Sequence, residues 1–299
     1  MMSETGQKRL FRVVFPEAHD PRVAEAMRRL QADHGVRSVP VHDGAPDQAP
    51  DQAPDQAAVD LLCRQRPGLK PALARRLLHK PLYRAAALVA AGQADAMVAG
   101  AANPTRRVIE AATMVIGLAD GVEIPSSFFL MRLADGREMI FADCAVNATP
   151  DATGLAAIAQ ASRHSARALL GDARIALLSF ATGSSGAGQS VGTVSKAVGI
   201  LSEAGIKASG PIQADAALNP DVAATKGMGD GKANVLVFPS LDAGNIAYKL
   251  LQELGGAQAI GPVLQGFRRP VCDLSRGARV DDIVQAALVT LRLGAAPSV

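Results

Sequence analysis

Residues 174–205, RIALLSFATGSSGAGQSVGTVSKAVGILSEAG, decide the fold class of this chain. The apolar run at 174–180 predicts a buried strand, and the pattern at 188–204 predicts a helix that ends at Gly205. The loop between them is rich in glycine and hydroxyl groups. A strand, a loop and a helix in this order form the repeating unit of α/β proteins with a parallel sheet.

The same alternation extends along most of the chain. Further strands are expected at 12–15, 36–41, 96–99 and 234–238. Further helices are expected at 71–91 and after the starts at Asp20-Pro21, Asn103-Pro104 and Asp242. The strands at 127–133 and 138–142 differ, because Asp135-Gly136 between them is typical of a hairpin turn. We therefore predict a three-layer α/β/α protein with a mixed, mostly parallel sheet, and the hairpin is alternatively a join between two lobes.

The composition describes a globular protein and argues against several function classes. The 299 residues, 48% of them hydrophobic and 20% charged, suffice for two domains or one large one. A net charge of +3 and an aromatic content of 3% do not favour nucleic-acid binding. We see neither a signal peptide nor an apolar run of about 18 residues that would span a membrane, and expect a cytoplasmic protein.

The tract at 45–56, APDQAPDQAPDQ, is a threefold tandem repeat. Proline in every copy disfavours both helix and strand, so we expect a mobile surface loop. A partner-docking arm is the alternative interpretation.

The segment at 273–280, DLSRGARV, with Asp281-Asp282 after it, contains several polar and charged side chains just before an amphipathic helix. Ser275, Arg276 and Asp282 thus lie in a loop and in the first helical turn, where free backbone N–H groups favour negative ligands. An ordinary helix entry is the alternative interpretation of the same residues.

Two other loops are candidates for anion binding. Backbone amides of the loop after the strand at 174–180 can cradle a phosphate, although the loop matches neither a Walker A nor a GxGxxG sequence. Its candidate residues are Thr182, Gly183, Ser184, Ser185 and Gly186. At 100–107, GAANPTRR, Arg106 and Arg107 can clamp a phosphate, or they are solvated residues of a helix start.

Known nucleophile motifs are missing from the sequence. It contains no GxSxG, HExxH or CxxC, and none of its five histidines lies in a catalytic-looking motif. Three widely spaced cysteines suit neither a disulfide framework nor a zinc site. We expect Cys144 to be buried packing, with a covalent thioester role as the alternative.

Seven motifs along nearly the whole chain resemble one family, the phosphate acetyltransferases (phosphotransacetylases) and the related phosphate butyryltransferases. The motifs are FPEAHDPRV (15–23), ADAMVAG (94–100), FADCAVNATPDA (141–152), SFATGSSGAG (179–188), GPIQADAA (210–217), VFPSLDAGNIAYK (237–249) and IGPVLQGFRRPVCDLSRGARVDDIV (260–284). The last motif is the most specific of the seven, and their order also matches the family.

The resemblance implies a reversible transfer of an acetyl group between acetyl phosphate and coenzyme A, by direct attack of the CoA thiol in a ternary complex. It implies a two-domain fold like that of isocitrate and isopropylmalate dehydrogenases. Domain I would comprise 1–128 plus 263–299 and domain II 129–262, with the active site in the cleft between them. It further implies a homodimer with neither a metal nor a permanently bound cofactor.

Site residues follow from the same resemblance. Arg276 would hold the phosphoryl oxygens, Ser275 would hydrogen-bond the tetrahedral intermediate, and Asp282 would take the thiol proton. The loop at 182–186 would contact the acyl phosphate. One departure concerns the family pattern T-T-x-D-x-x-R-P, whose arginine falls on Glu110. Either Arg106 or Arg107 would then supply the missing cation from one turn earlier, or the affinity for phosphate would be lower, or the acyl substrate would differ.

Three alternatives stay open at this point. A phosphate propanoyl- or butyryltransferase would differ only in the size of its acyl pocket. A non-catalytic acyl-CoA-sensing, phosphotransacetylase-like domain would keep the fold without turnover. A nicotinamide-dependent decarboxylating dehydrogenase would share the fold, but it needs a carboxylate cluster for a divalent metal, which we do not find in the sequence.

Overall fold

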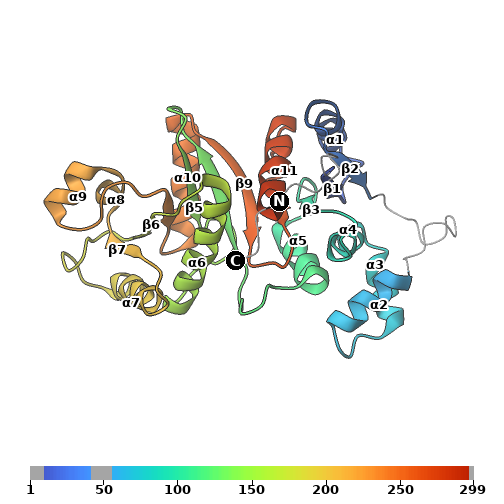
Figure 1. Cartoon of the computed structure of the whole chain (residues 1–299), viewed down its shortest axis with the longest axis horizontal. Coiled ribbons are helices and arrows are strands. Elements are labelled where there is room, and N and C mark those ends of the chain that lie inside the picture. The colour runs from blue at the N-terminus through green and yellow to red at the C-terminus, as the bar shows by residue number, and fades with distance from the viewer. Residues whose placement is uncertain (1–9, 42–55, 296–299) are drawn as a thin grey trace, which may run out of the picture. The chain divides into compact units, whose positions relative to one another are not determined.

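The computed structural model describes residues 10–41 and 56–295, which fall into two compact units (Figure 1). Unit 1 contains the chain up to Gly117 and again from Phe267, and unit 2 contains Leu118–Gly266. The domain boundaries expected at 128 and 262 stay a prediction, because compactness alone does not define a folding domain. The repeat tract lies outside the described residues except for Gln56, so the expected loop is not described here.

Unit 1 is built on a parallel sheet with the strand order β2-β1-β3-β10. Its elements are β1 (Arg12–Phe15), α1 (Pro21–His34), β2 (Arg37–Pro40), α2 (Gln56–Gln65), α3 (Pro71–Leu78), α4 (Pro81–Ala90), β3 (Ala96–Ala99), α5 (Thr105–Ala111), a π-helical turn (Ala112–Ile116), β10 (Val271–Asp273) and α11 (Val280–Ala295). The apolar runs of β1 and β3 are buried along nearly their whole length, as strands covered on both faces require.

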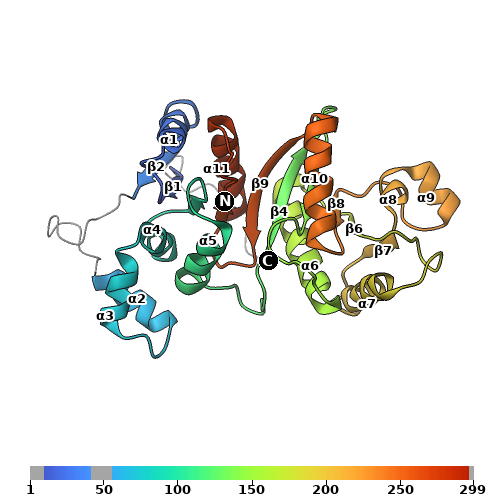
Figure 2. The ribbon, with the colours of Figure 1, turned by 180° about the vertical axis from the view of Figure 1, so that it is seen from behind.

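Helices cover both faces of the sheet of unit 1. Helices α1 and α11 pack against each other on one face, and α4 lies against β1 and β3 on the other (Figures 1 and 2). Asp20 caps α1, as expected, by accepting a 2.8 Å hydrogen bond from the backbone N–H of Arg22. Pro21 occupies the first helical position, where a backbone N–H would have no acceptor within the helix.

Unit 2 is built on a mixed sheet with the strand order β9-β4-β5-β8-β6-β7. Its elements are β4 (Ser126–Arg132), β5 (Glu138–Ala142), α6 (Ala152–Leu170), β6 (Ile175–Leu178), α7 (Gln189–Glu203), β7 (Ala208–Ile212), α8 (Ala214–Leu218), α9 (Pro220–Lys226), β8 (Val235–Val237), α10 (Leu241–Gly255) and β9 (Gln258–Gln265). Strand β4 is antiparallel to β5 and β9, which confirms the hairpin, while β5, β8, β6 and β7 run parallel. The predicted mixed, mostly parallel α/β sheet is therefore confirmed.

The side chains of unit 2 alternate between the two faces of its sheet. Met139 and Phe141 of β5 join Leu236 of β8 in an apolar cluster that also contains Ala216 of α8 and Tyr248 of α10. Helix α6 covers the opposite face from α10, which Figures 1 and 2 show from the two sides. This arrangement gives the three layers that the alternating pattern predicts.

Two helix boundaries differ from the sequence-based expectation. The helix expected over 71–91 is divided into α3 and α4, because Pro81 cannot donate a backbone hydrogen bond and begins a new helix. Helix α10 is capped by Ser240, whose hydroxyl accepts from Ala243 N at 3.3 Å, and Asp242 lies inside its first turn instead. An aspartate is common both at the N-cap and in the first turn of a helix, so the sequence pattern could not decide which position Asp242 occupies.

Gly244 in the first turns of α10 tests this packing. An added Cβ would lie 2.4 Å from the Asp143 carbonyl oxygen, so Gly244→Ala should destabilise the protein by about 2 kcal/mol. Gly199→Ala in α7 is the matched control: its Cβ would meet nothing within 4 Å, and alanine should stabilise the helix by up to about 1 kcal/mol. Urea unfolding curves measure both changes, and a Gly244→Ala protein as stable as wild type would contradict the packing.

Candidate functional site

The carboxyl ends of β1, β3 and β10 meet at one edge of the sheet of unit 1, because these strands are parallel neighbours. Ligands of such sheets bind at this edge. The segments that leave it contain Glu17, the 100–107 loop and helix start, and the turn with Ser275 and Arg276. Unit 1 thus brings the 100–107 segment and the serine–arginine turn to the same edge.

The amides of the 100–103 loop already hold an anion, the carboxylate of Glu17. Its Oε2 accepts from Ala101 N at 2.7 Å, and its Oε1 accepts from Ala102 N at 3.0 Å and from Asn103 N and Nδ2 at 2.7 Å. Glu17 is only 2% exposed, so these donors replace its lost hydration. A phosphate bound near this loop would have to use side chains rather than these amides.

Asp273 is a second buried carboxyl at this edge. Its Oδ2 accepts from Thr105 Oγ1 at 2.5 Å, whereas Oδ1 has no hydrogen-bond partner within the described chain. Burial raises the pKa of Asp273 to about 7, and the charge of Glu17 adds to this effect. Gly100, with a φ of +104°, permits the close approach, because a Cβ there would lie 2.4 Å from Oδ1.

Ser275 and Arg276 follow this buried strand end in an exposed turn. Ala278 N donates to Ser275 O at 2.9 Å, and Gly277 N donates to Ser275 Oγ at 3.3 Å. No carboxylate of the described chain pairs with the Arg276 guanidinium. An unpaired guanidinium beside a hydroxyl on a defined turn can bind the oxygens of a phosphoryl group.

Asp282 lies in the first turn of α11, as expected, and its side chain already has a partner there. Its Oδ2 accepts from Arg279 N at 2.9 Å and lies 3.4 Å from Arg279 Nε. This is one half of a capping box, in which the third helical residue bonds back to the N-cap amide. Asp282 therefore has a structural role beside any role in proton transfer.

The 182–186 loop of unit 2 follows the carboxyl end of β6 and is held by its own hydrogen bonds. Thr182 N donates to Ser185 Oγ at 2.9 Å, and Gly183 N donates to Pro211 O at 2.9 Å. The buried hydroxyl of Thr182 accepts from Gln213 N at 3.1 Å. Ser184 and Ser185 are exposed, so the loop offers hydroxyl groups from a fixed backbone.

Arg106 and Arg107 are exposed in the first turn of α5. Glu110, one turn further on, accepts a 2.9 Å hydrogen bond from the Tyr83 hydroxyl of α4. Burial, followed by this hydrogen bond, raises the pKa of Tyr83 to about 12. The structure thus gives Glu110 a partner of its own on α4.

Cys144 is fully buried, and this burial raises the pKa of its thiol. The expectation of a packing residue is confirmed, because the thiolate needed for a covalent thioester is disfavoured there. Among residues 10–41 and 56–295, no group of three or more His, Cys, Asp or Glu is placed to hold a metal ion. None of the described helices has the length and continuous apolarity of a membrane span.

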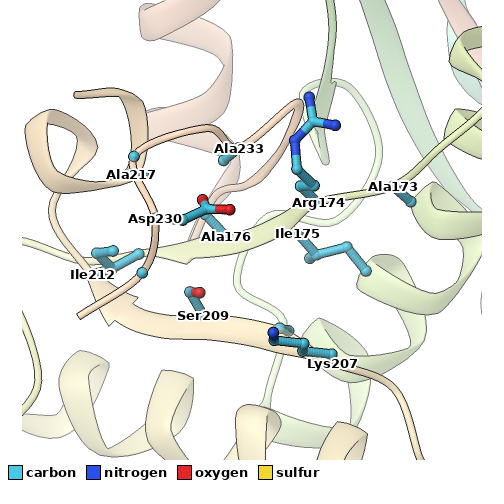
Figure 3. A pocket seen from close by; sticks show the side chains of 13 residues that line it. Ala173, Arg174, Ile175, Ala176, Lys207, Ser209, Ile212, Ala217, Asp230 and Ala233 are labelled. Carbon is cyan, nitrogen blue, oxygen red and sulfur yellow. The ribbon is translucent and has the colours of Figure 1, made fainter. Parts of the chain in front are cut away.

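Unit 2 also contains a cavity of about 390 Å³ (Figure 3). Its lining includes Arg174 and Lys207, which directly precede β6 and β7 and therefore mark the amino ends of these strands. The 182–186 loop leaves β6 at the opposite end. In Figure 3 the Arg174 guanidinium points away from Ser209, and it is paired with Asp172. We do not assign the cavity to the candidate site.

Sequence reasoning missed the buried groups that organise this edge, namely Glu17, Asp273 and Thr105. A signal was present: Glu17 lies in a quoted motif two residues after a buried strand, and Asp273 ends another strand. Acidic residues at the carboxyl ends of parallel strands are candidates for such contacts.

Known proteins of one family are similar to this chain over most of its length. The model of the family described as Phosphate acetyl/butaryl transferase matches residues 2–291. A phosphate acetyltransferase of Paracoccus denitrificans is 41% identical over 297 residues, which cover 93% of both chains. That of Nitratidesulfovibrio vulgaris is 46% identical over 233 residues, which cover 76% of this chain but only 33% of that longer protein.

Solved structures agree with the sequence relatives. The EutD phosphotransacetylase from Staphylococcus aureus superimposes with a TM-score of 0.85 at 36% identity, covering 95% of this chain and 94% of its own. A 4-hydroxythreonine-4-phosphate dehydrogenase from Klebsiella pneumoniae reaches 0.53 at 14% identity, over 96% and 100%, and shares the fold alone. The resemblance inferred from the motifs is thus confirmed, and the chain belongs to the phosphate acetyl/butaryl transferase family.

Proposed function

We propose that this protein is a phosphate acetyltransferase, which transfers an acetyl group reversibly between acetyl phosphate and coenzyme A. Relatives with this name cover nearly the whole chain. The observation that carries the proposal is the exposed Ser275-Arg276 turn, whose guanidinium has no carboxylate partner in the described chain. A cation kept unpaired at the carboxyl edge of a parallel sheet is suited to a phosphoryl group.

In the proposed reaction the CoA sulfur attacks the carbonyl carbon of acetyl phosphate, and the carbon–oxygen bond to phosphate then breaks. Arg276 holds the phosphoryl oxygens, and Ser275 Oγ hydrogen-bonds the tetrahedral intermediate. The thiol proton passes to Asp282. A thiol ordinarily ionises about 4.6 pH units above an aspartate, so proton transfer concerted with attack is the easier route.

Further parts of the proposal follow from the family resemblance. Thr182, Gly183, Ser184, Ser185 and Gly186 contact the acyl phosphate, and Arg106 and Arg107 add positive charge. Coenzyme A is a co-substrate, and we propose that no resident metal takes part, because arginine can supply the positive field. We also propose that the protein acts as a homodimer in the cytoplasm.

A CoA-dependent assay with acetyl, propanoyl and butanoyl phosphates side by side tests the proposed function. We expect thioester formation from those acyl phosphates that fit the acyl pocket, with the highest kcat/KM for acetyl phosphate. A preference for butanoyl phosphate would indicate a phosphate butyryltransferase. Binding of CoA without any thioester formation would indicate a sensing domain and would overturn the proposal.

Arg276→Ala is expected to lower kcat/KM by about 10²–10³-fold, because the phosphoryl charge loses its bidentate partner. Arg276→Lys should recover only part of this loss, since an ammonium is a point charge. Arg137→Ala is the control, because Arg137 is an exposed turn residue paired with Asp135. Near-normal turnover of Arg276→Ala would remove Arg276 from the site.

Asp282 needs a pair of substitutions, because it caps α11 in addition to its proposed role in proton transfer. Asp282→Asn keeps an oxygen acceptor for Arg279 N but cannot take a proton, so kcat should fall at least tenfold while Tm changes little. Asp282→Ala should lower both kcat and Tm, with a capping loss of about 1 kcal/mol. Equal kcat for wild type and Asp282→Asn would leave Asp282 with the capping role only.

Arg106→Ala and Arg107→Ala test whether these residues replace the family arginine at the position of Glu110. The effective residue should show a KM for phosphate or acetyl phosphate raised about tenfold, with the KM for CoA nearly unchanged, because the lost charge faces the phosphoryl group. Arg76→Ala, an exposed arginine of α3, is the control. If neither variant changes the phosphate kinetics, this segment lies outside the site.

A further inference from the structure

Arg22, in the first turn of α1, reaches across the sheet edge of unit 1 to the turn that contains Ser275 and Arg276. Its Nη1 donates to the carbonyl oxygens of Arg276 at 2.7 Å and of Ala278 at 2.9 Å. Its Nη2 donates to the carbonyl oxygen of Ala101 at 3.1 Å. A single guanidinium therefore joins the turn after β10 to the loop after β3.

Asp20 holds this guanidinium in place. Arg22 Nε donates to Asp20 Oδ1 at 3.1 Å, and Nη2 donates to Oδ2 at 2.7 Å, which forms a two-pronged ion pair. Asp20 is itself fixed, since its Oδ1 also accepts from Arg22 N at the start of α1. The hydrogen bond from Arg22 is the main cause that lowers the pKa of Asp20.

A guanidinium has five N–H donors, and all five of Arg22 have acceptors here. No donor is left for a substrate, so Arg22 differs in kind from Arg276, whose exposed guanidinium has no carboxylate partner among residues 10–41 and 56–295. Two of the five bonds go to main-chain carbonyls on either side of Gly277. Without Arg22, the turn would be held chiefly by the contacts that Ser275 makes to Gly277 and Ala278.

We propose that Arg22, fixed by Asp20, is a positioning residue, which holds the backbone of the Ser275–Ala278 turn so that Ser275 and Arg276 meet the acyl phosphate in one geometry. This inference rests on the proposed function. Catalytic side chains on a loop need such support, because a displacement of about 1 Å can cost about 10²-fold in rate. Lysine cannot replace Arg22, because three donors on one nitrogen cannot span Asp20 and three carbonyls.

Steady-state kinetics of Arg22→Lys, Arg276→Ala and the double variant test the inference. Arg22→Lys should lower kcat about 10–100-fold with the KM for CoA nearly unchanged. Because Arg22 acts partly through Arg276, the same substitution should cost less in the Arg276→Ala background than in wild type. Arg28→Lys, which alters an exposed arginine of α1 paired with Glu25, is the control. An equal loss in both backgrounds, or no loss in either, would overturn the inference.

Hydrogen exchange gives a readout that does not depend on the proposed activity. In Arg22→Lys, the amides of Gly277 and Ala278 should exchange about tenfold faster than in wild type, while those in the middle of α1 keep their rates. Should Arg22→Lys fail to fold, Asp20→Asn releases the ion pair but keeps a good N-cap, and the same amides should exchange faster. Unchanged exchange would refute the positioning role even in an active enzyme. Faster exchange in a protein without acyltransferase activity would refute the proposed function, but it would still support the contact between Arg22 and the turn.

Discussion

Burial of the Glu17 carboxylate is the constraint on which the carboxyl edge of unit 1 depends. A carboxylate removed from water needs hydrogen-bond donors, and here the amides of 101–103 supply them. The loop after β3 is thereby wrapped around Glu17, which sets the start of α5 and places Thr105 against Asp273. Asp273 ends β10 two residues before Ser275, so this buried pair of acids fixes the point from which the exposed turn starts.

Unit 2 also contains a buried carboxylate that accepts hydrogen bonds from the amides of a loop. The Asp143 carboxylate, 2% exposed, accepts from the amides of Ala145, Val146 and Asn147 and from the Ser127 hydroxyl. An amide nest that is occupied by an internal carboxylate is closed to phosphate. We therefore propose that other groups bind phosphate, namely the 182–186 loop and the guanidinium of Arg276, which has no carboxylate partner in the described chain.

The sequence predicted those features that depend on neighbouring residues along the chain. Alternating apolar runs predicted the sheet, Asp135-Gly136 the hairpin, and Asp20-Pro21 the start of α1. Pro81 is a signal in the sequence for the division of the 71–91 helix, although the sequence-based expectation did not use it. Glu17, Asp273 and Arg22 could not be assigned roles, because their partners lie about 80 to 250 residues away and only the parallel pairing of β1, β3 and β10 brings them together.

We propose that the acetyl group passes directly between acetyl phosphate and CoA on the exposed Ser275-Arg276 turn, without a covalent acyl-enzyme. Exchange of radiolabelled phosphate into acetyl phosphate, measured with and without CoA, distinguishes direct transfer from a covalent acyl-enzyme. Direct transfer predicts exchange only when CoA is present, because phosphate leaves as the thioester forms, and predicts its loss in Arg276→Ala. If the wild-type protein catalysed phosphate exchange at an undiminished rate without CoA, an acyl-enzyme intermediate would be present. That result would contradict direct transfer.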